Sequence, residues 1–199
     1  MELVLATKNR HKVDEIKLIL ASASVNATVK TIEDFPRIPE VEETESTLEA
    51  NALKKARAVF QATKLPSLAD DSGLEVFYLA KRPGVYSARY AGPSATYAEN
   101  NKKLLNELKA VPPRRRNAQF RCVIALITDK GEHVVEGITE GKILEAARGS
   151  SGFGYDPIFQ PNGYMQTYAE MPLDLKNNIS HRAKALEKLK PHLRDYFTS

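Results

Sequence analysis

The sequence predicts a mixed α/β fold in a single domain that spans residues 1–199. Three observations carry this prediction. Short apolar strand patterns alternate with helical patterns through the first half of the chain, which is typical of α/β proteins. Two further strand patterns meet at the turn sequence 129–131, which indicates a hairpin. A chain of 199 residues is also long enough to bury one substantial core.

The elements of the first half follow from apolar spacing. They are a buried strand at 2–6, a helix carrying Val13, Ile16 and Leu20, a half-exposed strand at 25–29 and a helix from about 46 to 63. Ser46 and Glu49 have the spacing of a capping box, which predicts the start of the last of these helices. The acidic, proline-containing stretch 33–45 is expected to be a loop.

The second half is richer in strands. It comprises a strand at 67–69 broken at 70–73 and resumed at 74–79, a helix opened by the capping box Thr96 to Glu99, a hairpin of 119–128 with 133–139, a strand at 157–160 and a last helix capped by Ser180. Pro191 lies within this last helix and is expected to kink it or to start a new turn.

Composition excludes several classes of protein. The chain is 42% hydrophobic and 27% charged, so a globular protein is expected rather than a disordered one. Its longest apolar run, 122–127, is far too short to cross a membrane, and the N-terminus lacks the pattern of a signal peptide. The single cysteine, Cys122, is expected to be a buried apolar residue in the reducing cytoplasm. A net charge of +4 weakly favours an anionic ligand.

The segment 149–159 is the hardest to explain by folding alone. Three of the ten glycines of the chain fall within six residues here, and Phe153 and Tyr155 alternate with them. Glycine loses more backbone entropy on folding than any other residue, so such a cluster indicates unusual dihedral angles or close approach of a ligand. Backbone N–H groups, aromatic rings and the carboxylate of Asp156 together suit a nucleotide, although a tight glycine turn between strands would have the same composition.

The segment Thr7-Lys8-Asn9-Arg10-His11-Lys12 joins the first strand to the first helix. A helix start presents unpaired N–H groups and the positive end of its dipole, which favours binding of an anion. Thr7 and Asn9 could add hydrogen bonds, and Lys12 could place a charge on a phosphate. A solvated, well-capped helix start is the alternative.

Two groups of carboxylates could hold a hard cation such as Mg²⁺, which prefers oxygen ligands. One is the acidic loop with Glu40, Glu42, Glu43 and Glu45, most of which are expected to be solvated. The other is the pair Asp70-Asp71, where burial or mutual repulsion could tune one carboxylate to act as a base. A simple turn is the alternative for this pair.

The start of the last helix, Ser180-His181-Arg182, offers free N–H groups to an anion or to the edge of a base, although a surface cap would look the same. Taken without their context, Lys176 is expected to be a surface lysine and Arg89 a structural ion-pair residue. The chain has no Walker A loop, dinucleotide fingerprint, hydrolase elbow or zinc spacing.

Taken in order, six segments resemble the inosine triphosphate pyrophosphatases, which act on non-standard purine nucleoside triphosphates. These segments are Thr7-x-Asn9-x-x-Lys12, Glu43 before the Asn51-Ala52 helix, Ala69-Asp-Asp-Ser-Gly-Leu74, Pro83-Gly-x-x-Ser-Ala-Arg-Tyr90, Gly152-Phe-Gly-Tyr-Asp-Pro-Ile-Phe159 and Ser180-His-Arg182. Each is weak alone, but six in the right order over nearly the whole chain are specific.

The resemblance implies an elongated, two-lobed α/β fold around a long mixed sheet flanked by helices, with the site in the cleft and usually a homodimer. It implies hydrolysis of ITP, dITP and XTP to the monophosphate and pyrophosphate with Mg²⁺. We also expect a cytoplasmic location, with neither nucleic acid nor membrane as a partner.

The resemblance also implies roles for individual residues. Asp71 would be the base that activates water and would share Mg²⁺ with Glu43. Residues assigned to the substrate are Thr7, Lys8, Asn9, Arg10, His11 and Lys12 for the triphosphate, Ser72, and, around base and sugar, Phe153, Gly154, Tyr155, Asp156, Lys176, His181 and Arg182.

Two positions depart from the family pattern. Lys8 stands where many relatives have glycine, and Ala50 precedes Asn51 where an acid is common, which puts the metal shell in doubt. Asp70 in place of Asp71 could be the main metal ligand. Two other functions remain open: a Maf-like pyrophosphatase of modified pyrimidine nucleotides, whose opening motif differs, and a nucleotide- or RNA-binding module without catalysis, with 114–116 as its best basic patch.

Overall fold

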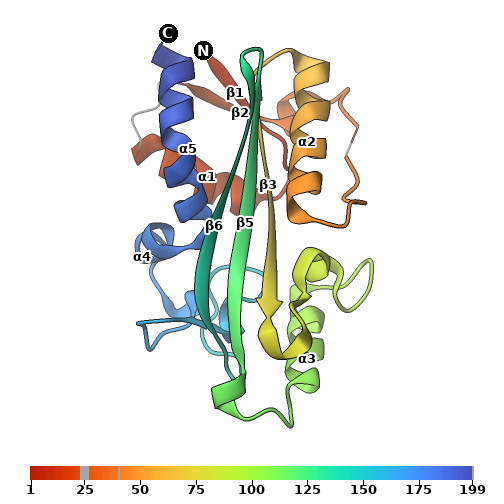
Figure 1. The fold of residues 1–199 in the computed structure, drawn as a ribbon, viewed down its shortest axis with the longest axis vertical. Coiled ribbons are helices and arrows are strands. Elements are labelled where there is room, and N and C mark those ends of the chain that lie inside the picture. Colours follow the sequence, from red (N-terminus) through yellow and green to blue (C-terminus); the bar gives the residue numbers. More distant parts are fainter. Residues whose placement is uncertain (23–26, 40, 199) are drawn as a thin grey trace. The chain divides into compact units, whose positions relative to one another are not determined.

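The computed structural model describes residues 1–22, 27–39 and 41–198 (Figure 1). The chain divides into two compact units, and each is described by itself. Unit 1 comprises Met1–Asp71, Cys122–Gly137 and His181–Ser199, and unit 2 comprises Ser72–Arg121 and Ile138–Ser180. No helix within the described residues is long and apolar enough to span a membrane.

The chain forms a mixed sheet with helices, so the predicted α/β class is confirmed. The strands are β1 (Glu2–Leu5), β2 (Thr28–Thr31), β3 (Ser67–Val76), β4 (Arg82–Pro83), β5 (Asn117–Thr128), β6 (Gly131–Ile143) and β7 (Phe159–Pro161), and their order is β2-β1-β3-β5-β6-β7 with β4 beside β3. The helices are α1 (Arg10–Ser22), α2 (Leu48–Thr63), α3 (Tyr97–Glu107), α4 (Leu173–Ile179) and α5 (His181–Thr198). β1 pairs in parallel with β2 and β3, whereas β4 on β3 and β7 on β6 are antiparallel.

In unit 1, helices α1 and α5 lie side by side and share one apolar core with the strands (Figure 1). The apolar positions that predicted α1, Val13, Ile16 and Leu20, are all buried in this core, together with Leu186 and Leu189 of α5. Cys122 is buried there as well, as expected. Because α1 and α5 are held by one core, Lys12 of α1 and Arg182 of α5 are brought together at Asp70 of β3.

The core of unit 2 is more aromatic. Phe120 of β5 meets the ring of Phe159 edge-on, with ring centroids 4.7 Å apart, and Tyr168 lies beside both. Leu104 and Leu108 join the same core, which places α3 against the sheet. Thr96 caps α3 through its side chain and Glu99 completes the predicted capping box.

Three predictions on the first half of the chain are corrected. The strand at 67–69 does not break at 70–73, because β3 runs without interruption from Ser67 to Val76. α1 begins at Arg10, so the expected loop 7–12 is shorter. The N-cap of α2 is Thr47, whose hydroxyl accepts a hydrogen bond from the amide of Ala50, and not Ser46.

The second half also differs in detail. Residues 156–158 form a 3-10 turn and the strand β7 begins at Phe159, so the predicted strand 157–160 starts too early. Helix α4 was not predicted, and α5 continues through Pro191 as one helix. The hairpin of β5 and β6 is confirmed and is longer than predicted. Of the strand predicted at 25–29, residues 25 and 26 lie outside the described residues, as does Glu40 of the acidic loop.

Gly137 of β6 fixes the position of α5 within unit 1. A Cβ built on Gly137 would clash with two backbone atoms of α5, the carbonyl oxygen of His181 and the nitrogen of Ala185. Neither atom can move without moving the helix. We therefore expect Gly137→Ala to lower the free energy of unfolding by about 2 kcal/mol or more, the cost of inserting an atom into a packed contact.

Urea unfolding measures this loss. Val134→Ala is the matched control, because Val134 is an exposed residue of the same strand and its truncation should cost less than about 1 kcal/mol. Equal losses in the two variants would show that Gly137 does not determine where α5 lies.

Candidate active site

The segment that follows β1 is organised by Asn9 at the start of α1. The amide of Asn9 donates to the hydroxyl of Thr7 at 3.1 Å, and the side chain of Asn9 accepts from the amide of Lys12 at 3.3 Å. Asn9 therefore acts as the cap of the first turn of α1. Lys8, Arg10 and His11 are exposed, as binding of a triphosphate by this segment would require.

Asp70 is the centre of a buried ionic cluster in unit 1. Its Oδ2 atom lies 3.1 Å from the ammonium of Lys12 and accepts hydrogen bonds from Nε and Nη2 of Arg182 at 3.2 and 3.0 Å. Burial alone would raise the pKa of Asp70, but Lys12 and Arg182 outweigh it and hold this pKa far below its usual range. Asp70 is therefore a permanent anion that binds cations of α1 and α5.

Asp71 has the opposite electrostatic character. It is 4% exposed, and its Oδ2 accepts a hydrogen bond from the side-chain amide of Asn51 at 3.0 Å. Burial is the largest influence and, with the negative charge of Glu43, raises the pKa of Asp71 to about 6, although Lys55 opposes the shift. Adjacent aspartates thus receive a low and a high pKa, which is the separation expected of a structural anion beside a base.

The carboxylates of Glu43 and Asp71 both lie near the ammonium of Lys55 on α2. Its ammonium lies 2.5 Å from Oε1 of Glu43 and 3.9 Å from Oδ1 of Asp71, and it also donates to the carbonyl oxygen of Asp70 at 2.7 Å. Burial alone would raise the pKa of Glu43, but Lys55 holds it below its ordinary value.

The oxygen atoms of Glu43 and Asp71 are the donors that Mg²⁺ prefers, and Mg²⁺ commonly uses one or two carboxylates together with phosphates and water. The two carboxylates already converge on one cation, the ammonium of Lys55, so these residues fit the ion. Within the described part of the chain no group of three or more His, Cys, Asp or Glu residues is arranged to hold a metal. Any Mg²⁺ here would therefore complete its shell with water and phosphate oxygens.

In unit 2 the glycine-rich segment is organised by Asp156. Its Oδ2 atom accepts a hydrogen bond from the amide of Phe153 at 2.8 Å and one from the ammonium of Lys176 at 2.7 Å. Gly152 has a φ of +74°, and a Cβ there would clash with the same carboxylate. The glycine cluster is thus explained at this position by close approach of a side chain and by a left-handed backbone.

The ring of Phe153 lies next to two partners in unit 2. The ammonium of Lys176 is 4.9 Å from the centre of the ring, and the ring of Tyr97 is 6.1 Å away. Tyr155 is buried and its hydroxyl donates to the carbonyl oxygen of Ser87 at 2.9 Å. The predicted residues Phe153, Asp156 and Lys176 are therefore brought together, whereas the hydroxyl of the predicted Tyr155 binds Ser87.

We expect Asp156→Asn to raise the KM for a nucleotide about tenfold, because loss of the charge weakens the anchors of both Phe153 and Lys176. The measurement is steady-state kinetics with the best nucleotide substrate. Asp174→Asn, which removes an exposed carboxylate of α4, is the control. A variant with unchanged KM would show that this hydrogen-bonded arrangement is not needed for binding.

A comparison with known families decides the relationship of this chain. The model of the Ham1 family matches residues 3–192. The chain belongs to the Ham1 family. Similar curated proteins are named dITP/XTP pyrophosphatase: that of Geobacter sulfurreducens is 50% identical over 192 residues and that of Clostridium perfringens 49% over 198, with 96% of both chains covered in each case.

Solved structures of Ham1 proteins confirm the fold. The Ham1 protein of Coxiella burnetii has a TM-score of 0.88 at 42% identity, over 98% of this chain and 99% of the other. That of Staphylococcus aureus has a TM-score of 0.87 at 38% identity, over 98% and 100%. The match to the Ham1 family and the curated dITP/XTP pyrophosphatases confirm the predicted resemblance to the inosine triphosphate pyrophosphatases.

The remaining predicted residues of this Ham1 chain fall in both units. His181 and Arg182 begin α5 in unit 1 and are both buried, at 5% and 1% exposure, so the alternative of a surface cap is wrong. Ser72 is a half-buried residue of β3 in unit 2, and Gly154 accepts a hydrogen bond from the side chain of Asn101 at 3.0 Å through its carbonyl oxygen. The substrate-binding roles of all these residues stay predictions.

Sequence reasoning gave no role to three buried polar residues of unit 1: Glu15, Asn51 and Lys55. Asn51 and Lys55 are four residues apart, so they lie on the same face of α2. Lys12 and Glu15 are three apart on α1 and share a face in the same way. The signal that could have identified them is a pair of polar residues three or four positions apart on a helix whose neighbouring positions are apolar.

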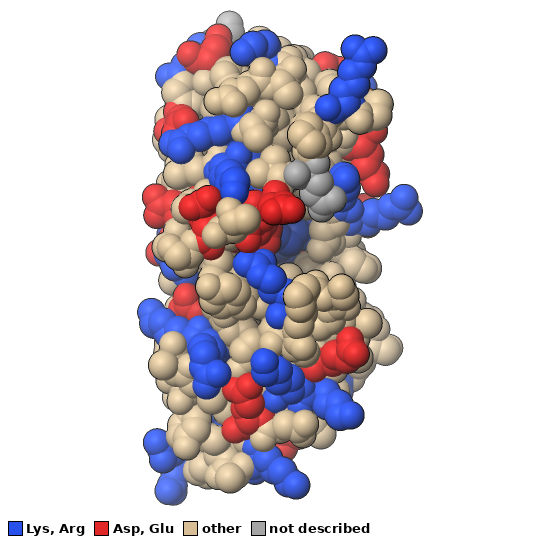
Figure 2. Space-filling model, turned by 90° about the vertical axis from the view of Figure 1, so that its right-hand side faces the viewer, with Lys and Arg blue, Asp and Glu red and all other residues tan. Residues whose placement is uncertain are grey.

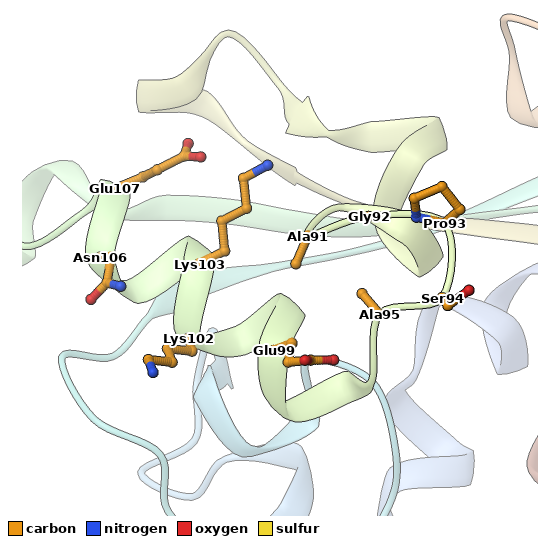
Figure 3. Close-up of a pocket in the computed structure, with 10 residues that line it drawn as sticks. All are labelled: Ala91, Gly92, Pro93, Ser94, Ala95, Glu99, Lys102, Lys103, Asn106 and Glu107. Atoms are coloured by element: carbon orange, nitrogen blue, oxygen red, sulfur yellow. The ribbon is translucent and has the colours of Figure 1, made fainter.

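A hollow of about 640 Å³ in unit 2 is lined by none of the predicted site residues. Figure 3 shows the loop 91–95 facing α3, from which Glu99, Lys102, Lys103, Asn106 and Glu107 line the hollow. Lys103 donates to the carbonyl oxygen of Tyr90 at 2.6 Å and Glu107 accepts from the hydroxyl of Tyr90 at 2.6 Å. Contacts within unit 2 therefore account for both of these charges.

The face drawn in Figure 2 carries acidic and basic side chains interspersed with one another. The net charge of +4 is thus not gathered into a single basic field across this face. Such a surface gives electrostatics no preference for a long polyanion on this side of the molecule.

Proposed function

We propose that this Ham1 protein hydrolyses the non-standard purine nucleoside triphosphates ITP, dITP and XTP to the monophosphate and pyrophosphate. The observation that carries the proposal is Asp71, a buried carboxylate whose pKa is raised to about 6 while its neighbour Asp70 stays ionised. The names of the curated relatives, which are dITP/XTP pyrophosphatases, support the same reaction.

Asp71 is the general base of this reaction. A pKa near 6 leaves the carboxylate mostly ionised at neutral pH yet more basic than an ordinary aspartate. Water attacks the α-phosphorus, its proton passes to Asp71, and the bond between the α-phosphorus and the bridging oxygen breaks to release pyrophosphate. The hydrogen bond from Asn51 holds one carboxylate oxygen in place while the other accepts the proton.

Glu43 and Asp71 would hold Mg²⁺, which when bound neutralises charge on the phosphate oxygens. Lys12 has its ammonium buried against Asp70; burial alone would lower the pKa of Lys12, but Asp70 raises it above its ordinary value. Lys12 therefore remains a cation for the phosphates. The exposed Lys8, Arg10 and His11 supply further hydrogen-bond donors from the start of α1.

Selection of the base follows from its hydrogen-bonding pattern. Hypoxanthine and xanthine carry an oxo group at position 6, where adenine carries an amino group, so N–H donors favour the former. The guanidinium of Arg182 is bound to Asp70 and Glu15. We therefore assign the N–H donor that Arg182 offers to the base to its main chain, at the start of α5. Phe153, Gly154, Tyr155, Asp156 and Lys176 are assigned to base and sugar by the sequence motif.

Incubation of the pure protein with Mg²⁺ and ITP, XTP, dITP, GTP, ATP or dUTP, each alone, tests the proposal. We expect pyrophosphate from ITP, XTP and dITP and little from ATP or GTP. Orthophosphate as the product, or preference for a modified pyrimidine nucleotide, would replace the proposed reaction. Absence of turnover with metal and pH varied, combined with salt-dependent binding of RNA, would favour a binding module.

Four further properties belong to the same proposal. They are a requirement for Mg²⁺, a homodimer, a cytoplasmic location and a single functional domain over residues 1–199. Removal of divalent ions with EDTA, followed by return of Mg²⁺, tests the first, and light scattering of the pure protein tests the second.

A further inference from the structure

Glu15 is a buried acid that the proposed reaction does not use. It lies on α1, its side chain is 5% exposed, and its Oε2 atom accepts a hydrogen bond from Nη1 of Arg182. Burial of a carboxylate is unfavourable unless charged partners compensate it, so a residue of this kind in unit 1 calls for a reason.

The contacts of Arg182 supply that reason. Nε and Nη2 of its guanidinium donate to Asp70, and Nη1 donates to Glu15, so two carboxylates from two elements hold its planar group from different sides. The side chain is 1% exposed. Arginine presents its donors in a rigid fork, so carboxylates on separate edges fix both its position and its orientation.

The charges of the cluster balance. Lys12 and Arg182 are the cations, and Asp70 and Glu15 are the anions. Lys12 and Glu15 are three residues apart on one face of α1, so this helix contributes one charge of each sign. Without Glu15, two buried cations would share Asp70, and the guanidinium would be drawn toward that single carboxylate.

Arg182 is the second residue of α5 and follows His181. Its side chain is therefore the anchor of the first turn of α5, which begins with two of the residues predicted to surround base and sugar, His181 and Arg182. We propose that Glu15 is a positioning residue that holds the start of α5 through Arg182 and thereby sets the affinity for the purine base. This inference rests on the proposed function and adds to it a residue of α1 that acts on substrate selection.

The test compares Glu15→Gln with Asp14→Asn, which removes the neighbouring exposed carboxylate of the same helix. For Glu15→Gln we expect KM for ITP to rise about tenfold and the preference for ITP over ATP to fall, with kcat within about threefold of wild type, because one partner of a buried charge pair is lost. Asp14→Asn should match wild type. A purely structural role would lower the melting temperature or the active fraction and leave KM and the ITP preference unchanged, and that result would overturn the proposal.

A double-mutant cycle with Arg182→Gln tests whether Glu15 acts through Arg182. We expect the double variant to have the KM and base preference of Arg182→Gln alone. Additive effects of the two substitutions would overturn the proposal. Should Glu15→Gln not fold, Glu15→Asp keeps the charge on a shorter side chain, and we expect a smaller rise in KM; an unchanged KM and preference in that variant would refute the role.

The wild-type protein in the same assays separates the two claims. Wild type without turnover of any nucleotide refutes the proposed function and the role of Glu15 with it. Active wild type together with an unaffected Glu15→Gln variant refutes only the role of Glu15.

Discussion

Asp71→Asn is expected to lower turnover of ITP by about 10²-fold or more while nucleotide still binds, because an amide cannot accept the proton of the attacking water. The substitution preserves the shape of the side chain and leaves an oxygen to accept the hydrogen bond from Asn51. The loss should therefore lie in kcat and not in affinity.

Single-turnover kinetics give the chemical step, and calorimetry gives the dissociation constant for ITP. Glu42→Gln is the matched control, because Glu42 is an exposed carboxylate next to Glu43 and its neutralisation should change turnover less than about twofold. Turnover near that of wild type in Asp71→Asn would remove Asp71 from the mechanism. In that case Asp70, bound by Lys12 and Arg182, would not be an attractive replacement, because its pKa is held far below its usual range.

The same variant should be more stable than the wild type. The pKa of Asp71 is raised in the folded protein to about 6, so the native state is penalised as pH rises from the ordinary aspartate value to 6, and the penalty is complete above that. Asp71→Asn should therefore gain about 3 kcal/mol in urea unfolding at pH 8 in EDTA, and the gain should disappear toward pH 4. Equal stability at both pH values would contradict the raised pKa.

The elements that sequence patterns predicted best are those with local signals. The capping box of Thr96 and Glu99 fixes the start of α3, and the apolar spacing of Val13, Ile16 and Leu20 fixes the buried face of α1. Both depend on residues within one or two turns of each other. The cap of α2 was displaced by one residue because Ser46 and Thr47 are both good caps, and only the backbone geometry separates them.

The prediction for β3 was wrong for a reason that no local pattern contains. Two aspartates, a serine and a glycine in succession have the composition of a turn. Here Asp70 is compensated by Lys12 and Arg182, and Asp71 by Asn51, all of which lie far away in sequence. Long-range charge pairs and a long-range hydrogen bond thus allow a strand to carry residues that ordinarily end one.

For the site, the motifs indicated which segments matter but not what their side chains contact. The predicted role of Arg182 toward the base stays a prediction, and the motif did not indicate that its guanidinium lies buried between Asp70 and Glu15. Asp156 was predicted to bind sugar or base, and in unit 2 it also holds Phe153 and Lys176. Such pairings depend on which helices share a core, so they become visible only once the fold is known.

Asp70→Asn is expected to lower the free energy of unfolding by about 3 to 5 kcal/mol, because it removes one partner of a buried charge pair. Lys12 and Arg182 would then be left beside the single charge of Glu15. Urea unfolding measures the loss of free energy of unfolding in Asp70→Asn. Asp14→Asn is the control, because it removes the same charge from an exposed residue of α1.

The pH dependence makes this prediction specific. The folded pKa of Asp70 is held below the unfolded value, so its contribution is complete above the ordinary aspartate pKa and is lost as pH falls toward the folded value. The stability difference between wild type and Asp70→Asn should thus be constant above about pH 5 and shrink below pH 4. The sign is the reverse of the Asp71 case, in which the variant, and not the wild type, gains relative stability as pH rises from 4 to 6. Two adjacent residues of one strand would then show opposite pH dependence, and a common trend in both variants would mean that Asp70 is not the fixed anion of the cluster.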